Sequence, residues 1–161
     1  MKSKIAFVGK AGSGKSTLAR YLKVQYSFEI FSFASPVKEI AYKFFGMTTK
    51  DRTLLQGIGD GLREKANPLV WVNFMKKKIE STQFFRLIVD DCRYVNEAEM
   101  LRKEGFIIIK LEGRKWELTE EQENNSSEKQ VEQVIPNFTL DTSRPLETTI
   151  QELEKIVFEE N

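Results

Sequence analysis

Residues 4–26, KIAFVGKAGSGKSTLARYLKVQY, decide the fold class of this chain. The run Lys4–Gly9 is apolar and closed by glycine, which is typical of a short buried strand. After the loop, apolar residues recur at helical spacing through Leu18, Leu22 and Tyr26. A strand, a glycine-rich loop and a helix, in this order, open a parallel α/β fold. We therefore expect an α/β protein.

The loop between this strand and helix carries a phosphate-binding pattern, because it matches GxxxxGK[ST] at each fixed position. Its glycines let consecutive backbone N–H groups turn inward around an anion, and the following helix adds its positive N-terminus. In this pattern Lys15 reaches the β- and γ-phosphates of ATP, and the Ser16 hydroxyl ligates Mg²⁺. The alternative is a glycine-rich turn with an incidental lysine. The predicted ATP-binding residues are Gly9, Lys10, Ala11, Gly12, Ser13, Gly14, Lys15, Ser16 and Thr17.

Composition excludes several classes of protein. The chain has 161 residues, enough for one compact domain, and a net charge of +1, which predicts no nucleic-acid partner. With Cys92 as its single cysteine and no histidine, it cannot form an internal disulfide, a His-ligated zinc site or a Ser-His-Asp triad. Its apolar runs are too short for a membrane span, and the first nine residues lead directly into the loop, which argues against a removable signal peptide. We expect a cytoplasmic protein.

The remaining apolar runs predict four more strands, and hence a three-layer fold with a five-stranded parallel sheet flanked by helices. The expected strands are 28–33, 84–91, 106–113 and 137–143.

Helix signals separate these strands. We expect helices from Ser35 as cap to Gly46, from Asn96 as cap to Gly105, and over 145–160. The last should bury an apolar stripe, which includes Leu146, Ile150, Leu153 and Val157. Residues 49–82 predict two helices that are broken at two places. The expected breaks are Gly57, Gly59 and Gly61, and Asn67-Pro68. The polar segment 114–133 predicts a lid or surface excursion with weak helical character.

A triphosphate site leaves switches, motors and kinases open. A guanine-specific switch would carry DxxG and NKxD after the loop, and neither pattern occurs. Motor ATPases need a longer core and an assembly interface, so a small kinase fits the length best.

A kinase also needs a pocket for the phosphate acceptor, beside the carboxyl ends of the same strands. Asp90 and Asp91 end the run 84–91, and Arg93 follows it. Arginine suits a phosphate, whereas paired carboxylates suit Mg²⁺-bound water or sugar hydroxyls. The alternative is an Asp91–Arg93 pair that stabilises the turn, with Glu97 complementing the helix dipole. Both interpretations stay open on spacing alone.

Four segments of the sequence, which occur in the same order and extend over nearly the whole chain, resemble the deoxynucleoside monophosphate kinases of bacteriophages and their bacterial relatives. This family belongs to the P-loop nucleoside monophosphate kinases. The blocks are the phosphate loop, FSFASPVKEIAYKFFG (31–46), LLQGIGDGLREKANPLVWVN (54–73) and VDDCRYVNEAEMLRKEGFIIIKL (89–111). The resemblance implies an acceptor site, with Arg63 and Arg93 as phosphate clamps. Its residues are Lys38, Gln56, Gly59, Arg63, Trp71, Asp91, Arg93 and Glu97.

Two further roles complete the expected site. Asp90 would hold a Mg²⁺-bound water. Arg114 would close over the triphosphate as a lid arginine. The alternative for Arg114 is a solvated basic residue that follows a strand. The chain departs from the family in two places. NNSSEK keeps Ser127 and Glu128 of a His-x-Ser-Glu motif without its histidine, and Asp60 follows Gly59 where relatives have threonine.

We therefore expect an ATP- and Mg²⁺-dependent kinase that converts a deoxynucleoside 5′-monophosphate, a small-molecule substrate, to the diphosphate. The alternatives are a P-loop kinase of another small acceptor, of the dephospho-coenzyme A or shikimate type, and a non-kinase nucleotide-binding switch. Residues 1–161 would form a single kinase domain, with an acceptor-binding helical segment at about 36–80 and a lid-like excursion at about 114–133. It would work in the cytoplasm, the host's if phage-encoded, and whether it forms a homodimer stays open.

Overall fold

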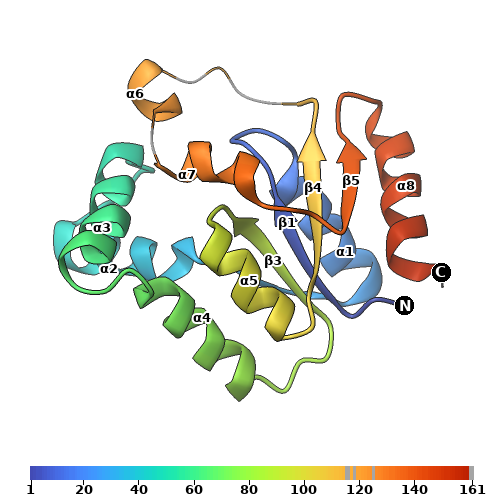
Figure 1. Ribbon diagram of the computed structural model, residues 1–161, viewed down its shortest axis with the longest axis horizontal. Helices are drawn as coiled ribbons and strands as arrows, with labels where there is room; N and C mark the ends of the chain where they lie inside the picture. Colours follow the sequence, from blue (N-terminus) through green and yellow to red (C-terminus); the bar gives the residue numbers. More distant parts are fainter. Residues whose placement is uncertain (115–116, 118, 125, 160–161) are drawn as a thin grey trace. The chain divides into compact units, whose positions relative to one another are not determined.

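A computed structural model describes residues 1–114, 117, 119–124 and 126–159. The chain divides into two compact units (Figure 1). The larger unit consists of Met1–Phe31 and the described part of Gln83–Asn161, and the smaller unit is Ser32–Thr82.

The larger unit is built on a parallel sheet of five strands in the order β2-β3-β1-β4-β5, which confirms the predicted fold class. Its strands are β1 Lys4–Val8, β2 Glu29–Phe31, β3 Leu87–Cys92, β4 Ile107–Glu112 and β5 Phe138–Asp141. The prediction that β3 begins at Phe84 is wrong, because pairing starts where Leu87 meets Lys4. Phe84 and Phe85 are exposed before the strand.

Helices cover both faces of this sheet. Its helical elements are α1 Lys15–Tyr26, α5 Val95–Lys103, α6 Glu120–Glu123, α7 Ser126–Gln130, η1 Val131–Gln133 and α8 Leu146–Phe158. Leu18 of α1 and Leu153 of α8 belong to one buried cluster with Ile5 and Phe7 of β1, so α1 and α8 share a face. In Figure 1, α5 lies in front of the strands and α1 behind them.

Two details of these helices differ from the predictions. The N-cap of α5 is Tyr94, so Asn96 lies inside the first turn. On α8, Leu146 is exposed and Thr149 is buried in its place, because the Thr149 hydroxyl donates to Pro145 O over 3.2 Å and needs no water. The segment predicted to have weak helical character contains the short helices α6 and α7.

The smaller unit contains three helices: α2 Ala34–Phe45, α3 Arg52–Lys65 and α4 Val70–Ser81. Its N-cap before α2 is Phe33, so the prediction of Ser35 as cap is wrong, while Gly46 ends the helix as predicted. The prediction of a break at the three glycines is also wrong, because α3 continues through them. Gly59 is buried there, and its carbonyl accepts a hydrogen bond from the Trp71 indole of α4 over 3.0 Å. Tertiary packing outweighs the low helix propensity of glycine.

No helix in the described part of the chain has both the length and the apolar character that crossing a bilayer requires.

Candidate active site

The predicted phosphate loop joins β1 to α1 in a conformation that depends on glycine. Gly12 and Gly14 have φ angles of 78° and 98°, which side chains rarely allow. A Cβ on Gly9 would lie 2.6 Å from Ser13 Oγ and 2.8 Å from the Leu111 carbonyl oxygen. The two fixed glycines of the pattern therefore have different causes: close approach at Gly9 and a left-handed backbone at Gly14.

Lys15 is the first residue of α1 and is almost fully buried, at 7% exposure. Its ammonium donates to the carbonyl oxygens of Gly9 and Lys10 over 2.6 and 2.8 Å, and to Ser13 Oγ over 3.3 Å. The loop thus surrounds its own lysine with oxygen atoms. Ser16 and Thr17, the next two residues, are exposed on the first turn of the helix.

The charge of Lys15 is disfavoured by its surroundings. Burial, followed by the nearby positive charge of Arg93, lowers the pKa of Lys15 to about 8. Three carboxylates oppose this shift and therefore lie near the ammonium: Glu128, Asp91 and Asp90. Since an added phosphate charge would favour the protonated amine, this position is suited to an anion.

A β-bulge in β3 brings two consecutive carboxylates to this place. Asp90 and Asp91 lie together opposite Phe7 of β1, because the register between the two strands shifts there. In a regular strand their side chains would point to opposite faces of the sheet. Both carboxylates act on the charge of Lys15, so this end of β3 lies near the phosphate loop.

Ser16 and Asp90 supply neighbouring oxygen atoms. The Ser16 hydroxyl donates to Asp90 Oδ2 over 3.4 Å. Hydroxyl and carboxylate oxygens suit Mg²⁺, which in triphosphate sites takes one or two protein ligands together with phosphates and water. Within the described ranges no three acidic or cysteine side chains form a metal site of their own. The chemistry of these two residues therefore fits Mg²⁺, and that they bind it stays a prediction.

The turn after β3 is held by Glu97, a buried carboxylate with 2% exposure. Its Oε2 accepts hydrogen bonds from the backbone N–H groups of Arg93 and Tyr94, over 2.9 and 3.2 Å. Glu97 thus fixes the start of α5, where a carboxylate also complements the helix dipole, as the alternative interpretation expects. Its predicted contact with an acceptor stays a prediction.

Arg93 pairs with a residue that the predicted site did not include. Its Nη1 lies 2.6 Å from Oε1 of Glu128 on α7. The other oxygen of Glu128 accepts a hydrogen bond from the backbone N–H of Ala11, in the phosphate loop, over 3.4 Å. The only sequence signal for Glu128 was its agreement with the Ser-Glu of the family motif.

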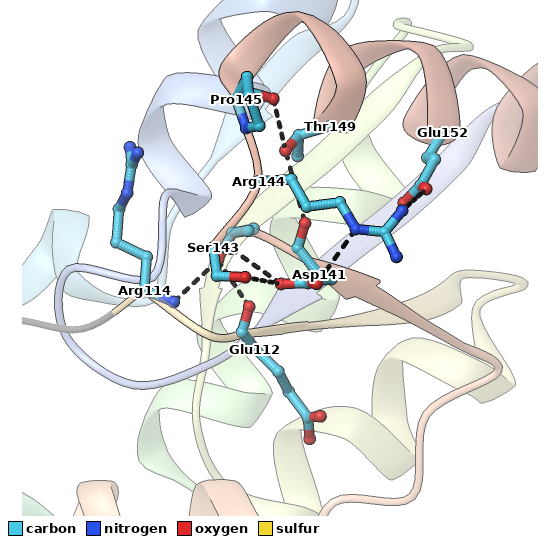
Figure 2. A network of polar contacts seen from close by, with 9 residues as sticks. Glu112, Arg114, Asp141, Ser143, Arg144, Pro145, Thr149 and Glu152 are labelled. Carbon is cyan, nitrogen blue, oxygen red and sulfur yellow. Dashed lines mark hydrogen bonds and ion pairs between the residues drawn. The ribbon is translucent and has the colours of Figure 1, made fainter.

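Arg114 is the second residue after β4, and its backbone is hydrogen-bonded to Thr142, the residue that follows β5 (Figure 2). Thr142 Oγ1 accepts a hydrogen bond from the Arg114 N–H over 3.2 Å and donates to the Glu112 carbonyl over 2.8 Å. Gly113, with a φ of 100°, approaches Ser143 so closely that a Cβ would lie 2.9 Å from the Ser143 Cβ. Figure 2 shows the Arg114 side chain extending away from this network. Its role as a lid arginine stays a prediction.

A cavity of about 200 Å³ adjoins these residues at the carboxyl end of β4. It lies between the first residues of the phosphate loop, the start of the segment after β4, and η1. Glu132 of η1 pairs with Lys10 over 3.3 Å and with Lys110 over 3.0 Å, and the latter contact lowers the pKa of Glu132 most strongly. Two lysines of the wall are thus neutralised, whereas the Arg114 side chain is exposed.

The other predicted acceptor residues belong to the smaller unit. Lys38 is exposed on α2, and Gln56 is half-buried on α3. Gly59, Arg63 and Trp71 lie together. A Cβ on Gly59 would lie 3.5 Å from Arg63 Nη1, and the Trp71 indole donates to the Gly59 carbonyl. Arg63 also pairs with Asp60 over 3.1 Å. That these residues bind an acceptor stays a prediction.

No protein-family model matches the sequence, and no curated protein matches it. Among solved structures, a gluconokinase from Sinorhizobium meliloti 1021 is similar, with a TM-score of 0.55 and 16% identity over 97% of this chain and 94% of that chain. A shikimate kinase from Aquifex aeolicus vf5 has a TM-score of 0.54 and 14% identity over 96% of this chain and 98% of that chain. This likeness shows the fold alone, a parallel sheet flanked by helices that this chain shares with the two kinases.

Proposed function

We propose that the chain is an ATP-dependent kinase of a small molecule. The observation that carries this proposal is the meeting of the phosphate loop and its Lys15 with Ser16–Asp90 and Arg93 in one place. Bound ATP with Mg²⁺ would supply the phosphoryl group. The protein would contribute positioning and charge neutralisation, which phosphoryl transfer mainly requires, so a chain without histidine suffices.

Each residue of the larger unit then has a task. Backbone N–H groups of the loop and Lys15 would bind the donor phosphates, and Ser16 and Asp90 would hold the metal. The cavity beside Arg114 has the place and size for part of the donor nucleoside, over which this arginine would close. Arg93, which pairs with Glu128 near Lys15, would bind the acceptor.

Two classes of acceptor are supported by different observations. A hydroxyl acceptor is supported by the two structural neighbours, which are a gluconokinase and a shikimate kinase. The adjacent carboxylates of Asp90 and Asp91 also suit a hydroxyl group, which needs a base near it. A deoxynucleoside 5′-monophosphate is supported by the four sequence blocks and by Arg93, whose guanidinium group suits phosphate. The neighbours favour the hydroxyl class.

A panel of acceptors tests the proposal. The purified chain with ATP and Mg²⁺ is assayed for ADP release, with product identified by mass spectrometry. The panel contains gluconate and other sugar acids, shikimate, dephospho-coenzyme A and the common ribo- and deoxyribonucleoside monophosphates. We expect transfer to one class of acceptor, and a loss of turnover in Lys15→Ala. ATP hydrolysis that no acceptor stimulates would instead support a nucleotide-dependent switch.

Arg93→Ala then tests the assignment of the two ends of the site. If Arg93 binds the acceptor, the variant raises the KM of the acceptor at least about tenfold and leaves the KM of ATP within about twofold of wild type. A loss confined to ATP would contradict the assignment.

A further inference from the structure

The short helix α7 is attached to the turn between β3 and α5 by alternate residues. Ser126 Oγ lies 3.0 Å from the Tyr94 hydroxyl, and Gln130 Oε1 accepts a hydrogen bond from the Val95 N–H over 3.4 Å. Between them, Glu128 pairs with Arg93. These contacts join residues that are 32 to 35 positions apart in sequence, all within the larger unit.

Glu128 uses both of its carboxylate oxygens. Oε1 lies against the Arg93 guanidinium and Oε2 against the Ala11 N–H, and the side chain is only 5% exposed. Burial of a carboxylate costs free energy unless it is paired and hydrogen-bonded. The Arg93 guanidinium and the Ala11 N–H therefore fix the position of the Glu128 side chain, and Glu128 in turn fixes theirs. Glu128 thereby sets the distance between Arg93 and the phosphate loop.

Arg93 keeps binding capacity in this arrangement. A guanidinium has five N–H donors in a rigid fork, and Nη1 makes the contact with Glu128. The side chain is 29% exposed, so the fork is not enclosed. Lys15 is close enough for like-charge repulsion with Arg93, which the negative charge of Glu128 offsets. Lys15 and Arg93 can therefore both stay positively charged beside the phosphate loop.

We propose that Glu128 is a positioning residue, which holds the Arg93 guanidinium beside the phosphate loop so that it can bind the carboxylate or phosphate of an anionic acceptor. This inference rests on the proposed function and deepens it, because it limits the acceptors to small anions. Glu128 itself touches neither substrate. Its effect on transfer passes through Arg93.

A double-mutant cycle tests this dependence. Wild type, Glu128→Gln, Arg93→Ala and the double variant are compared with the acceptor that the panel identifies. Glu128→Gln keeps the shape and an acceptor for the Ala11 N–H while removing the charge. We expect it to lower kcat/KM for the acceptor at least about tenfold, mainly through KM, because a small misplacement of a clamping group is costly. In the Arg93→Ala background the same change should cost less than about twofold.

Matched variants separate positioning from general stability. Glu99→Gln makes the same chemical change at an exposed position of α5 and should leave both kinetic constants unchanged. Glu128→Asp restores the charge on a shorter side chain and should recover part of the lost kcat/KM. Nitrogen-15 spectra of the Ala11 amide and the Arg93 guanidinium follow the contact without turnover. Both signals should shift in Glu128→Gln and stay in place in Glu99→Gln.

The outcomes are distinct. A loss that disappears in the Arg93→Ala background, with shifted Arg93 signals, supports the inference. Equal losses of kcat/KM from Glu128→Gln with Arg93 present and with Arg93→Ala overturn the inference. Wild-type kinetic constants in Glu128→Gln overturn it too. In both cases the proposed function is left intact, because the wild type still transfers the phosphoryl group. Unchanged nitrogen-15 signals of Arg93 in Glu128→Gln also overturn the inference. The inference is likewise overturned if Glu128→Gln fails to fold while Glu128→Asp folds and has wild-type kinetic constants. No transfer by wild type to any acceptor overturns the proposed function and the inference together. Comparison of carboxylate with phosphate acceptors in the panel shows which anion Arg93 binds.

Discussion

The hydroxyl of Ser16 and Oδ2 of Asp90 are joined by a hydrogen bond of 3.4 Å, which connects the first turn of α1 with β3. The two oxygens come from different segments, so a metal between them would depend on both. Ser16→Ala and Asp90→Asn should each raise the Mg²⁺ concentration for half-maximal turnover about tenfold or more, because Ser16 would hold the metal directly and Asp90 through a bound water. Titration of turnover with Mg²⁺ at saturating ATP measures this. An unchanged Mg²⁺ requirement in both variants would contradict the metal assignment.

Lys15 makes donor binding depend on pH. Burial lowers its pKa to about 8, so in the free protein its charge is lost as the pH rises through that value. Phosphates bound beside it would raise this pKa again, and binding of ATP near pH 8.5 should therefore take up a proton. Calorimetry in buffers of different ionisation enthalpy detects the uptake, which should vanish near pH 6.5 and in Lys15→Met. Turnover of Lys15→Met should fall at least about a hundredfold.

The same shift predicts the sign of a stability change. Between the folded pKa of about 8 and the ordinary lysine pKa of 10.5, the unfolded chain binds more protons at Lys15 than the folded chain does. The contribution of this lysine to the free energy of unfolding therefore rises with pH across that window. Lys15→Met should lack this component, and urea unfolding at several pH values compares the two chains. Proton uptake or pH-dependent stability equal to wild type in Lys15→Met would assign both effects to another group.

Two glycines, Gly9 in the phosphate loop and Gly57 inside α3, should respond in opposite ways to alanine. At Gly9 a Cβ would lie 2.6 Å from Ser13 Oγ and 2.8 Å from a backbone oxygen, so Gly9→Ala should destabilise the protein by about 1–3 kcal/mol and impair ATP binding. At Gly57, inside α3, nothing lies within 4 Å of the added carbon. Gly57→Ala should stabilise the protein by about 0.5–1 kcal/mol. Thermal unfolding with and without ATP distinguishes the two.

The carboxylate of Glu154 on α8 links that helix to α1. Its Oε1 accepts hydrogen bonds from the hydroxyls of Tyr21, over 2.6 Å, and Tyr26. The Tyr21 bond and then the Tyr26 bond lower the pKa of Glu154. This carboxylate therefore stabilises the fold fully above its ordinary pKa of 4.5 and loses that effect as the pH falls through the lower folded value.

Glu154→Gln should consequently flatten the loss of stability in acid. Denaturant unfolding between about pH 6 and about pH 3 measures the slope, with Glu99→Gln as the exposed control. Identical slopes in wild type and Glu154→Gln would mean that other carboxylates dominate acid unfolding.

Much of the larger unit could be predicted because its signals are local. The bounds of α1 follow from helical spacing after the glycine loop, and the five strands follow from short apolar runs. The smaller unit was harder to predict. Its α3 contains three glycines that locally favour a break, and what keeps it continuous is the contact of Gly59 with Trp71, 12 residues away. A tertiary contact of this kind leaves no periodic pattern.

The same distinction explains the candidate site. The phosphate loop is marked by eight consecutive residues, so its pattern predicts it, although Gly9 is also required by the close approach of Leu111 on β4. The pair Arg93–Glu128 depends on two segments that are 35 residues apart, and Glu128 stands in a polar run where acidic residues are common. The bulge at Asp90–Asp91 likewise arises only when β3 pairs with β1. Sequence pattern indicates which residues are present there, and only the fold brings them together.

The strand order has a consequence for the chain while it is being synthesised. β1 is made first, yet its neighbours in the sheet are β3 and β4, and β2 pairs with β3 alone. The strand before the nascent phosphate loop thus lacks its neighbour β3 until residue 92 has been made, and its neighbour β4 until residue 112 has been made. Before that point the apolar β1 and α1 lack their partners, and contacts so distant in sequence form slowly. A nucleotide that binds the fully framed loop can therefore assist folding only after β4 has been made.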